Sequence, residues 1–166
     1  MIFLSVGTQE PFDRLAKAVD DWAATHDEPV FGQLGAMKPE SYRPAHFEWC
    51  EYLSAGDYLA RLQESRALVA HVGMGSIITA LTHGKPLVML ARRASLGEHR
   101  NEHQLATAGR FRGRPGLHIA ADEGDVGARL DAVLAGAGDA EGEGGLPPHA
   151  APELVAAIRD FLHGTA

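Results

Sequence analysis

Short runs of apolar residues alternate along the chain with longer stretches in which apolar residues recur every three or four positions. Six runs have the length of buried strands, and they lie at residues 2–6, 30–34, 47–52, 67–71, 87–91 and 117–120. Helical spacing predicts helices over 11–24, 57–65, 76–83, 98–108 and from Asp122 to about residue 135. Strands that are apolar throughout are typical of parallel sheets covered on both faces. The alternation therefore predicts an α/β, doubly wound, Rossmann-like domain with a mostly parallel sheet of about six strands.

Residues that start and stop helices support these bounds. Pro11 suits the first position of a helix, where its missing N–H costs little. Ser54, with Asp57 three residues later, resembles a capping box. Gly84 fits a left-handed cap at the end of a helix, and Pro86 blocks continuation of that helix.

Composition divides the chain into three parts. Residues 1–135 carry the alternating pattern and are expected to form the Rossmann-like domain. Residues 136–149 are rich in glycine, acidic residues and proline, and they predict a flexible linker because they offer little to bury. Residues 150–166 return to apolar positions at helical spacing, which predicts a last helix packing on the same domain.

Charge and cysteine content exclude several classes of function. The 166 residues include 22 acidic and 15 basic side chains, and this net charge of −7 argues against nucleic-acid binding, which needs a basic surface. Cys50 is the only cysteine, so an intramolecular disulfide and a multi-cysteine zinc site are excluded, and a small buried apolar role is favoured. No apolar run approaches the ~20 residues of a membrane helix. The N-terminus also lacks the basic region of a signal peptide, so we expect a cytoplasmic protein.

Two glycine-marked loops follow predicted strands, at the edge where doubly wound sheets bind ligands. One is GTQE (7–10), and the other is HVGMGS (71–76). In the second, Gly73 and Gly75 permit a sharp turn and close approach of a ligand. The helix that we expect to open at Ser76 has unpaired N–H groups that favour an anion, and His71 can donate to the same oxygens. The loop therefore predicts a diphosphate cradle. A tight connection without a ligand is the alternative, because neither a P-loop lysine nor a third glycine follows.

A polar segment, GEHRNEHQLATA (97–108), follows the fifth predicted strand at the same edge. The side chains there that could reach a ligand are Glu98, His99, His103 and Gln104, with Arg92 and Arg93 just upstream. A solvated helix face is the alternative. His99 and His103 are expected four residues apart on one helix face, a spacing that metals exploit. No third ligand lies nearby in the sequence, so we expect no metal.

Four ordered motifs resemble a known family. They are MIFLSVGTQEPFDRL (1–15), HVGMGSIITAL (71–81), GKPLVML (84–90) and EHRNEHQLATA (98–108). Over residues 1 to 135 the chain resembles the C-terminal domain of family-28 glycosyltransferases. The similarity is to the small stand-alone subunits of two-part UDP-sugar transferases, which act in exopolysaccharide and dolichol-linked glycan assembly.

The resemblance implies roles for individual residues. The UDP diphosphate would bind to His71, Gly73, Met74, Gly75 and Ser76. The donor nucleoside and sugar would lie against Thr79, Arg93, Glu98, His103 and Gln104, and Gly7, Thr8 and Gln9 would line the cleft. Many relatives have an acidic ribose ligand where this chain has Thr79. A threonine cannot clamp a ribose diol with two acceptors, so Glu98 or the backbone would take this task.

The resemblance also implies a mechanism and a partner. The family's GT-B fold has two Rossmann-like domains with the active site between them, and this chain would supply the donor half. The expected partner is a membrane-associated subunit that carries the acceptor domain and recruits a polyprenol-linked or polysaccharide acceptor. The protein would then lie peripherally at the inner face of the membrane. The expected reaction is inverting hexosyl transfer from a UDP-sugar, with no metal or other cofactor. His99 and His103 are candidates for the general base, and the partner is another source.

Two other functions are compatible with the same residues. The chain could be a non-catalytic nucleotide-sugar-binding or regulatory subunit that acts as a homodimer. It could also be a different nucleotide-sugar enzyme on the same scaffold, such as an epimerase.

Overall fold

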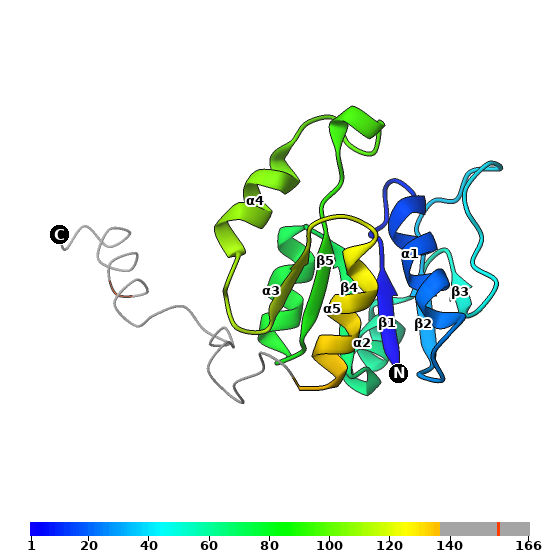
Figure 1. The fold of residues 1–166 in the computed structure, drawn as a ribbon, viewed down its shortest axis with the longest axis horizontal. Helices are drawn as coiled ribbons and strands as arrows, with labels where there is room; N and C mark the ends of the chain where they lie inside the picture. The colour runs from blue at the N-terminus through cyan, green and yellow to red at the C-terminus, as the bar shows by residue number, and fades with distance from the viewer. Residues whose placement is uncertain (137–155, 157–166) are drawn as a thin grey trace.

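The computed structural model describes residues 1–136 and Ala156, and it has a parallel α/β fold (Figure 1). Apart from Gly136 and Ala156, the predicted linker 136–149 and the predicted last helix 150–166 lie outside the described residues. A membrane-spanning helix is not found in the part of the chain that the structure describes.

The sheet has six strands in the order β3-β2-β1-β4-β5-β6, and every pairing between the described strands is parallel. The strands are β1 (Ile2–Ser5), β2 (Val30–Gln33), β3 (Glu48–Cys50), β4 (Ala67–His71), β5 (Leu87–Leu90) and β6 (Leu117–Ala120). This is the strand order of the Rossmann fold, with β1 and β4 side by side at the centre. The predicted fold class is confirmed.

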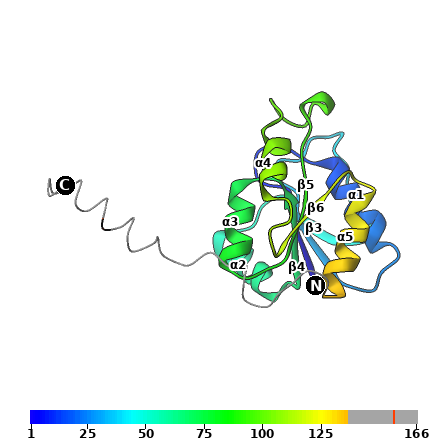
Figure 2. The same cartoon turned by 60° about the vertical axis from the view of Figure 1, so that its left-hand side comes forward.

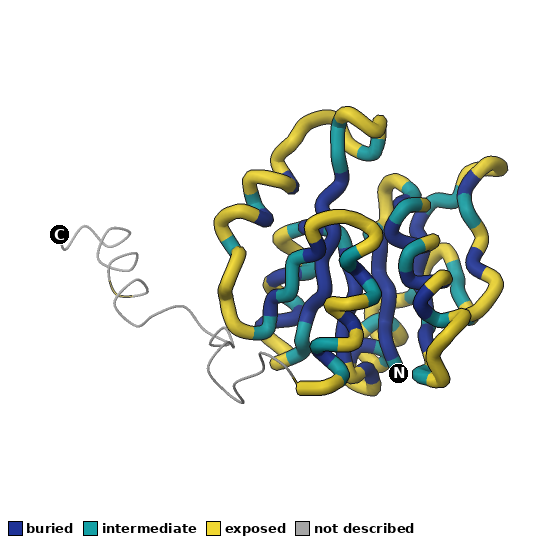
Figure 3. Tube along the Cα trace, viewed as in Figure 1, coloured by how far each residue is buried: buried dark blue, intermediate teal, exposed yellow. Residues whose placement is uncertain are grey.

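Helices cover both faces of the sheet (Figure 2). They are α1 (Asp13–Ala23), α2 (Ala55–Glu64), α3 (Met74–Thr82), α4 (His103–Phe111) and α5 (Asp125–Leu134), with a short 3₁₀ turn η1 (Ala94–Leu96). The helices α1 and α5 pack in one hydrophobic core, and α2, α3 and α4 contribute to the other. Side chains of β1 alternate between the two cores, Ile2 and Leu4 facing the first and Phe3 the second, and all three are fully buried. Figure 3 shows the strands as the buried centre.

Local signals explain where two helices begin and end. The Ser54 hydroxyl accepts a hydrogen bond from the Asp57 N–H at 3.1 Å, which satisfies an orphan donor at the start of α2. Gly84 has φ +59°, and the Lys85 N–H donates to the Ala80 carbonyl at 2.9 Å. This is the Schellman arrangement, so the predicted cap of α3 is confirmed.

The start of α4 was predicted five residues too early. The sequence pattern predicts a helix from Glu98, whereas α4 begins at His103. Gly97 is left-handed with φ +69°, which breaks the helical path after η1. The Asn101 side chain then accepts a hydrogen bond from the His103 N–H at 3.3 Å, a local turn contact that periodicity does not reveal. Residues 98–102 therefore form a loop that follows β5.

Candidate functional site

The strand order places two loops at the point where the direction of winding reverses. The chain runs from β1 to β2 and β3 on one side of β1, and it then crosses back to place β4 on the other side of β1. Because all strands are parallel, the loops after β1 and β4 leave the same edge and diverge, which opens a crevice between them. Both glycine-marked loops predicted from the sequence lie here, after Ser5 and after His71.

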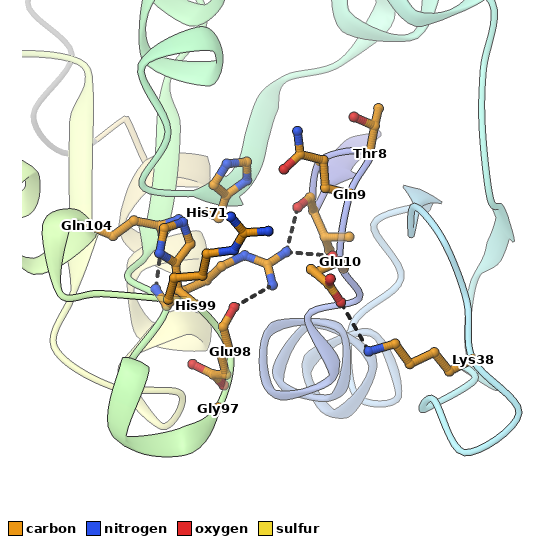
Figure 4. A pocket seen from close by; sticks show the side chains of 13 residues that line it. Thr8, Gln9, Glu10, Lys38, His71, Gly97, Glu98, His99 and Gln104 are labelled. Atoms are coloured by element: carbon orange, nitrogen blue, oxygen red, sulfur yellow. Dashed lines mark hydrogen bonds and ion pairs between the residues drawn. The ribbon is translucent and has the colours of Figure 1, made fainter.

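A cavity of about 940 Å³ opens at this edge (Figure 4). Of the residues singled out from the sequence, it is lined by Gly7, Thr8, Gln9, His71, Arg92, Glu98, His99 and Gln104. The first three come from the loop after β1 and the last four from the segment after β5. In Figure 4, His71 lies between these two groups. The structure thus brings together three segments that are distant in the sequence.

The remaining predicted residues do not line this cavity. They are Gly73, Met74, Gly75, Ser76, Thr79, Arg93 and His103. The first five belong to α3 and its N-cap, which adjoin the cavity through His71. The helix begins at Met74, two residues before the predicted start, so Ser76 is its third residue. The candidate site therefore has two parts, the cavity and the α3 N-terminus.

Two glycines hold the His71 ring in place. A Cβ on Gly73 would lie 2.4 Å from His71 Nε2, and a Cβ on Gly7 would lie 3.0 Å from His71 Cε1. Gly7 also has φ +96°, a conformation that other residues rarely adopt. The imidazole therefore packs directly against the two backbones, and any larger residue at Gly73 would displace it.

His71 is a neutral group at physiological pH. Burial lowers its pKa to about 4, and the positive charges of Arg92 and His99 act in the same direction. Its Nδ1 is buried and has no hydrogen-bond partner among the described residues. A hydrogen bond with the Val6 backbone acts in the opposite direction on this pKa. A neutral imidazole carries one N–H, which can be donated to the Val6 carbonyl or to a ligand without adding a charge.

The N-terminus of α3 is open to an anion. Gly73 is its N-cap, and no side chain of the described residues caps the helix. The N–H groups of Met74, Gly75 and Ser76 precede the first intrahelical donor, Ile77, which binds the Gly73 carbonyl. A Cβ on Gly75 would meet no atom of the described chain within 4 Å. These donors and the helix dipole favour a phosphate or carboxylate at this end.

Gln104 is positioned by the backbone that follows β5. Its side chain is buried, and its amide oxygen accepts a hydrogen bond from the Arg92 N–H at 3.0 Å. The amide NH₂ has no partner among the described residues and belongs to the cavity wall. Gln104 can therefore donate to a hydroxyl group of a bound ligand.

The carboxylate of Glu98 is engaged within the protein. Arg14 binds it with two hydrogen bonds of 2.8 Å, and the Arg93 N–H donates to it at 2.9 Å. This bidentate pair is mostly buried, with 12% of Arg14 and 14% of Glu98 exposed. The hydrogen bonding of Arg14 to the Glu98 carboxylate raises the pKa of Arg14. Glu98 therefore holds the loop after β5 in place.

The two arginines after β5 bind backbone carbonyls. The buried guanidinium of Arg92 donates to carbonyls of the loop after β1 and of Glu98. Arg93 reaches the Ala121 carbonyl at 3.2 Å on the exposed surface. Both terminal nitrogens of Arg92 therefore donate within the protein.

His99 and His103 do not share a helix face. His99 lies in the loop before α4 and lines the cavity, whereas His103 opens the helix and lies outside the cavity lining. The predicted metal-type spacing on one helix is therefore wrong. Within residues 1–136, no group of three metal-ligating side chains is found. Cys50 ends the edge strand β3, half-buried and outside the cavity lining, and burial raises the pKa of its thiol.

Several residues of the cavity were not predicted from the sequence. They are Val6, Glu10, Lys38, Gly97 and Arg100. Lys38 Nζ lies 3.0 Å from a Glu10 carboxylate oxygen, joining the loop after β2 to the loop after β1 (Figure 4). The only sequence signal for Lys38 was its place in a Pro-containing loop, and such a loop has no periodicity that would locate it.

Comparison with known proteins supports the fold. No family model matches the sequence, and no curated protein matches it. Among solved structures, the glycosyltransferase SnogD from Streptomyces nogalater resembles the chain with a TM-score of 0.52 and 22% sequence identity. The match covers 82% of this chain and 34% of the SnogD chain. The chain has the fold of one half of a GT-B glycosyltransferase. It spans about one third of the length of the SnogD chain.

Proposed function

We propose that the chain is the donor-binding part of an inverting UDP-sugar glycosyltransferase. The observation that carries this proposal is the neutral His71, clamped between Gly7 and Gly73 beside the uncapped N-terminus of α3. These groups lie at the switch point of a glycosyltransferase-like fold, where such sheets bind ligands.

The proposed diphosphate site uses backbone donors. The N–H groups of Met74, Gly75 and Ser76 would bind the phosphate oxygens, and His71 would donate one further hydrogen bond. Charge develops on the diphosphate as the bond to the sugar breaks. Fixed donors aimed at that charge stabilise the transition state more than the bound substrate, which is how they accelerate the step.

The sugar would lie in the cavity on the other side of His71. The Gln104 amide would donate to a sugar hydroxyl, and Gly7, Thr8 and Gln9 would form the opposite wall. His99 is the candidate base within the cavity, since His103 is not part of its lining. Thr79 follows the phosphate site along α3, and the nucleoside would extend in that direction.

The acceptor half of the site would come from a second domain or subunit. A GT-B active site lies between two Rossmann-like domains, and the described residues form one of them. We propose that a membrane-associated partner supplies the other and brings a lipid-linked or polysaccharide acceptor. The chain would then act peripherally at the inner face of the membrane.

Titration calorimetry with UDP tests the donor site. Gly75→Asp adds an acidic residue to the first turn of α3, which suits the helix dipole and should preserve folding. The same carboxylate repels a phosphate, so UDP binding should be lost. Gly56→Asp is the matched control, because Gly56 occupies the equivalent second position of α2 and is exposed.

The proposal expects wild type and Gly56→Asp to bind UDP alike. Failure of the wild-type chain to bind UDP, or equal binding by Gly75→Asp, would overturn the donor-site assignment.

A further inference from the structure

Arg92 joins the two loops that form the cavity walls. One terminal nitrogen donates to the carbonyls of Val6 at 2.9 Å and Glu10 at 2.8 Å. The other donates to the carbonyls of Pro11 at 2.7 Å and Glu98 at 3.3 Å. Arg92 is 4% exposed, and the central carbon of its guanidinium lies 4.5 Å from the centre of the Phe12 ring.

These contacts satisfy backbone carbonyls at both ends of the loop after β1. Residues 8–10 are exposed, and Gly7 takes a left-handed conformation before them. Buried backbone carbonyls need a hydrogen-bond donor, and Arg92 donates to three of the carbonyls around this loop. A planar guanidinium with five N–H donors can reach several carbonyls at once, which a lysine cannot do.

An ion pair fixes the opposite wall. Arg14, on α1, binds Glu98 with two hydrogen bonds and also donates to the Ala91 carbonyl at 2.8 Å. The amide oxygen of Gln104 binds the Arg92 N–H. Arg92 therefore contacts the first wall through its side chain and the second through both side chain and backbone.

We propose that Arg92, supported by the Arg14–Glu98 pair, is the positioning group of this site and forms the ligand cavity before the ligand arrives. It holds Gly7 against the His71 ring and Gln104 beside it. The inference deepens the proposed function and rests on it for the identity of the ligand. Pre-organised walls spare the ligand the cost of ordering two loops, so the result is tighter binding.

The test compares arginine variants in the full chain. Arg92→Gln removes the fork that spans both loops, and Arg92→Lys keeps the charge but not the fork. Arg66→Gln is the matched control, because Arg66 also donates to a backbone carbonyl, that of Leu134, but lies next to the amino end of β4. Its other partner is the Glu28 carboxylate. The readouts are amide hydrogen exchange of Val6 and Glu98 without ligand, the NMR signals of the His71 ring, and UDP affinity. The N–H groups of Val6 and Glu98 donate to the carbonyls of Gln33 and Arg93, and their own carbonyls accept from Arg92.

The proposal expects exchange at these amides to rise roughly ten-fold or more in both Arg92 variants, and UDP affinity to fall by a similar factor. The His71 pKa should rise in Arg92→Gln but stay below its ordinary value, because burial is the larger cause of its low pKa. It should rise less in Arg92→Lys, because only the lysine keeps a positive charge nearby. Arg66→Gln should change none of the three. If the substitutions only made the fold less stable, the melting temperature would fall, and the His71 pKa would be the same in Arg92→Gln and Arg92→Lys.

Glu98→Gln is a milder variant in case Arg92→Gln does not fold. Its control is Glu123→Gln, since Glu123 is the other carboxylate partner of Arg14 and is exposed. Faster amide exchange around residues 98–100 in Glu98→Gln, with no such change in Glu123→Gln, supports the proposal. Unchanged exchange in folded Arg92 and Glu98 variants overturns it. If wild type failed to bind UDP, the proposed function would fall, and exchange in the ligand-free chain would still decide the positioning role.

Discussion

At the scale of single residues, the site depends on glycines, which have no side chain. Gly7 and Gly73 leave the space that the His71 ring fills, and Gly75 leaves space that no described atom fills. The same residue type thus has two tasks at neighbouring positions. Gly73 serves the packing of the protein, whereas we propose that Gly75 serves the approach of a phosphate.

Alanine substitutions separate these tasks. Gly73→Ala should destabilise the fold by about 1–3 kcal/mol, because its Cβ overlaps the His71 ring. It should also weaken UDP binding. Gly109→Ala, in the exposed interior of α4, should instead raise stability by up to about 1 kcal/mol and leave UDP binding unchanged. Urea unfolding and calorimetry measure both effects, and equal stability of the two variants would contradict the packing of His71.

His71 also makes stability depend on pH. The unfolded chain takes up a proton on this residue near pH 6.5, whereas the folded chain does so only near pH 4, where burial has moved its pKa. The unfolded state therefore binds more protons between these values. Stability falls as pH drops from about 6.5 to 4, by at most about 1.4 kcal/mol per pH unit from this residue.

Urea unfolding at pH 7.0 and pH 5.5 of wild type and His71→Gln checks this slope. The other histidines are common to both proteins, so the variant should lose less stability on acidification. An identical loss in both would show that His71 titrates normally in the folded state.

At the scale of elements, the loop between β2 and β3 is anchored by one carboxylate. Asp20 on α1 is 1% exposed, and it accepts hydrogen bonds from the Tyr42 hydroxyl at 2.6 Å and from the His46 N–H at 2.8 Å. The hydrogen bond that Tyr42 donates to Asp20 raises the pKa of Tyr42 to about 12. The same loop carries Lys38 to the cavity.

Asp20→Asn should therefore cost about 1–3 kcal/mol of stability, because a charge-assisted network is lost in a buried place. Asp21→Asn is the control. Its exposed pair with Lys17 is worth at most about 1 kcal/mol. Ultraviolet titration of the tyrosines should show one phenol titrating nearer pH 10 in Asp20→Asn than in wild type. An unchanged Tyr42 titration would contradict this hydrogen bond.

Sequence patterns located elements well where burial sets the pattern. The bounds of β4 and β6 were predicted to the residue, since all but the end residue of β4 face the interior. The start of α4 was missed because the left-handed Gly97 and the hydrogen bond between Asn101 and His103 are local geometry, which periodicity does not reveal. The same limit explains why Arg14 and Lys38 were not predicted at the site. Their contacts, with Glu98 and Glu10, join positions that are 84 and 28 residues apart.

At the scale of the whole molecule, strand order decides where chemistry can occur. Placing β1 beside β4 puts the GTQE and HVGMGS loops at one crevice, although some 60 residues separate them. The sequence predicted this meeting because parallel strands share one carboxyl edge. It could not predict that the site divides into a cavity and a helix N-terminus, with His71 between them.

The central claim is that UDP binds beside His71, between the cavity and the N-terminus of α3. The most direct measurement is an NMR titration of the ¹⁵N-labelled full chain with UDP. We predict that the largest shift changes occur at the backbone amides of Met74, Gly75 and Ser76 and at the His71 ring. Amides at the opposite edge of the sheet, such as those of Arg66 and Leu87, should not move. Saturable shifts confined to that opposite edge, or no shifts at millimolar UDP, would contradict the account.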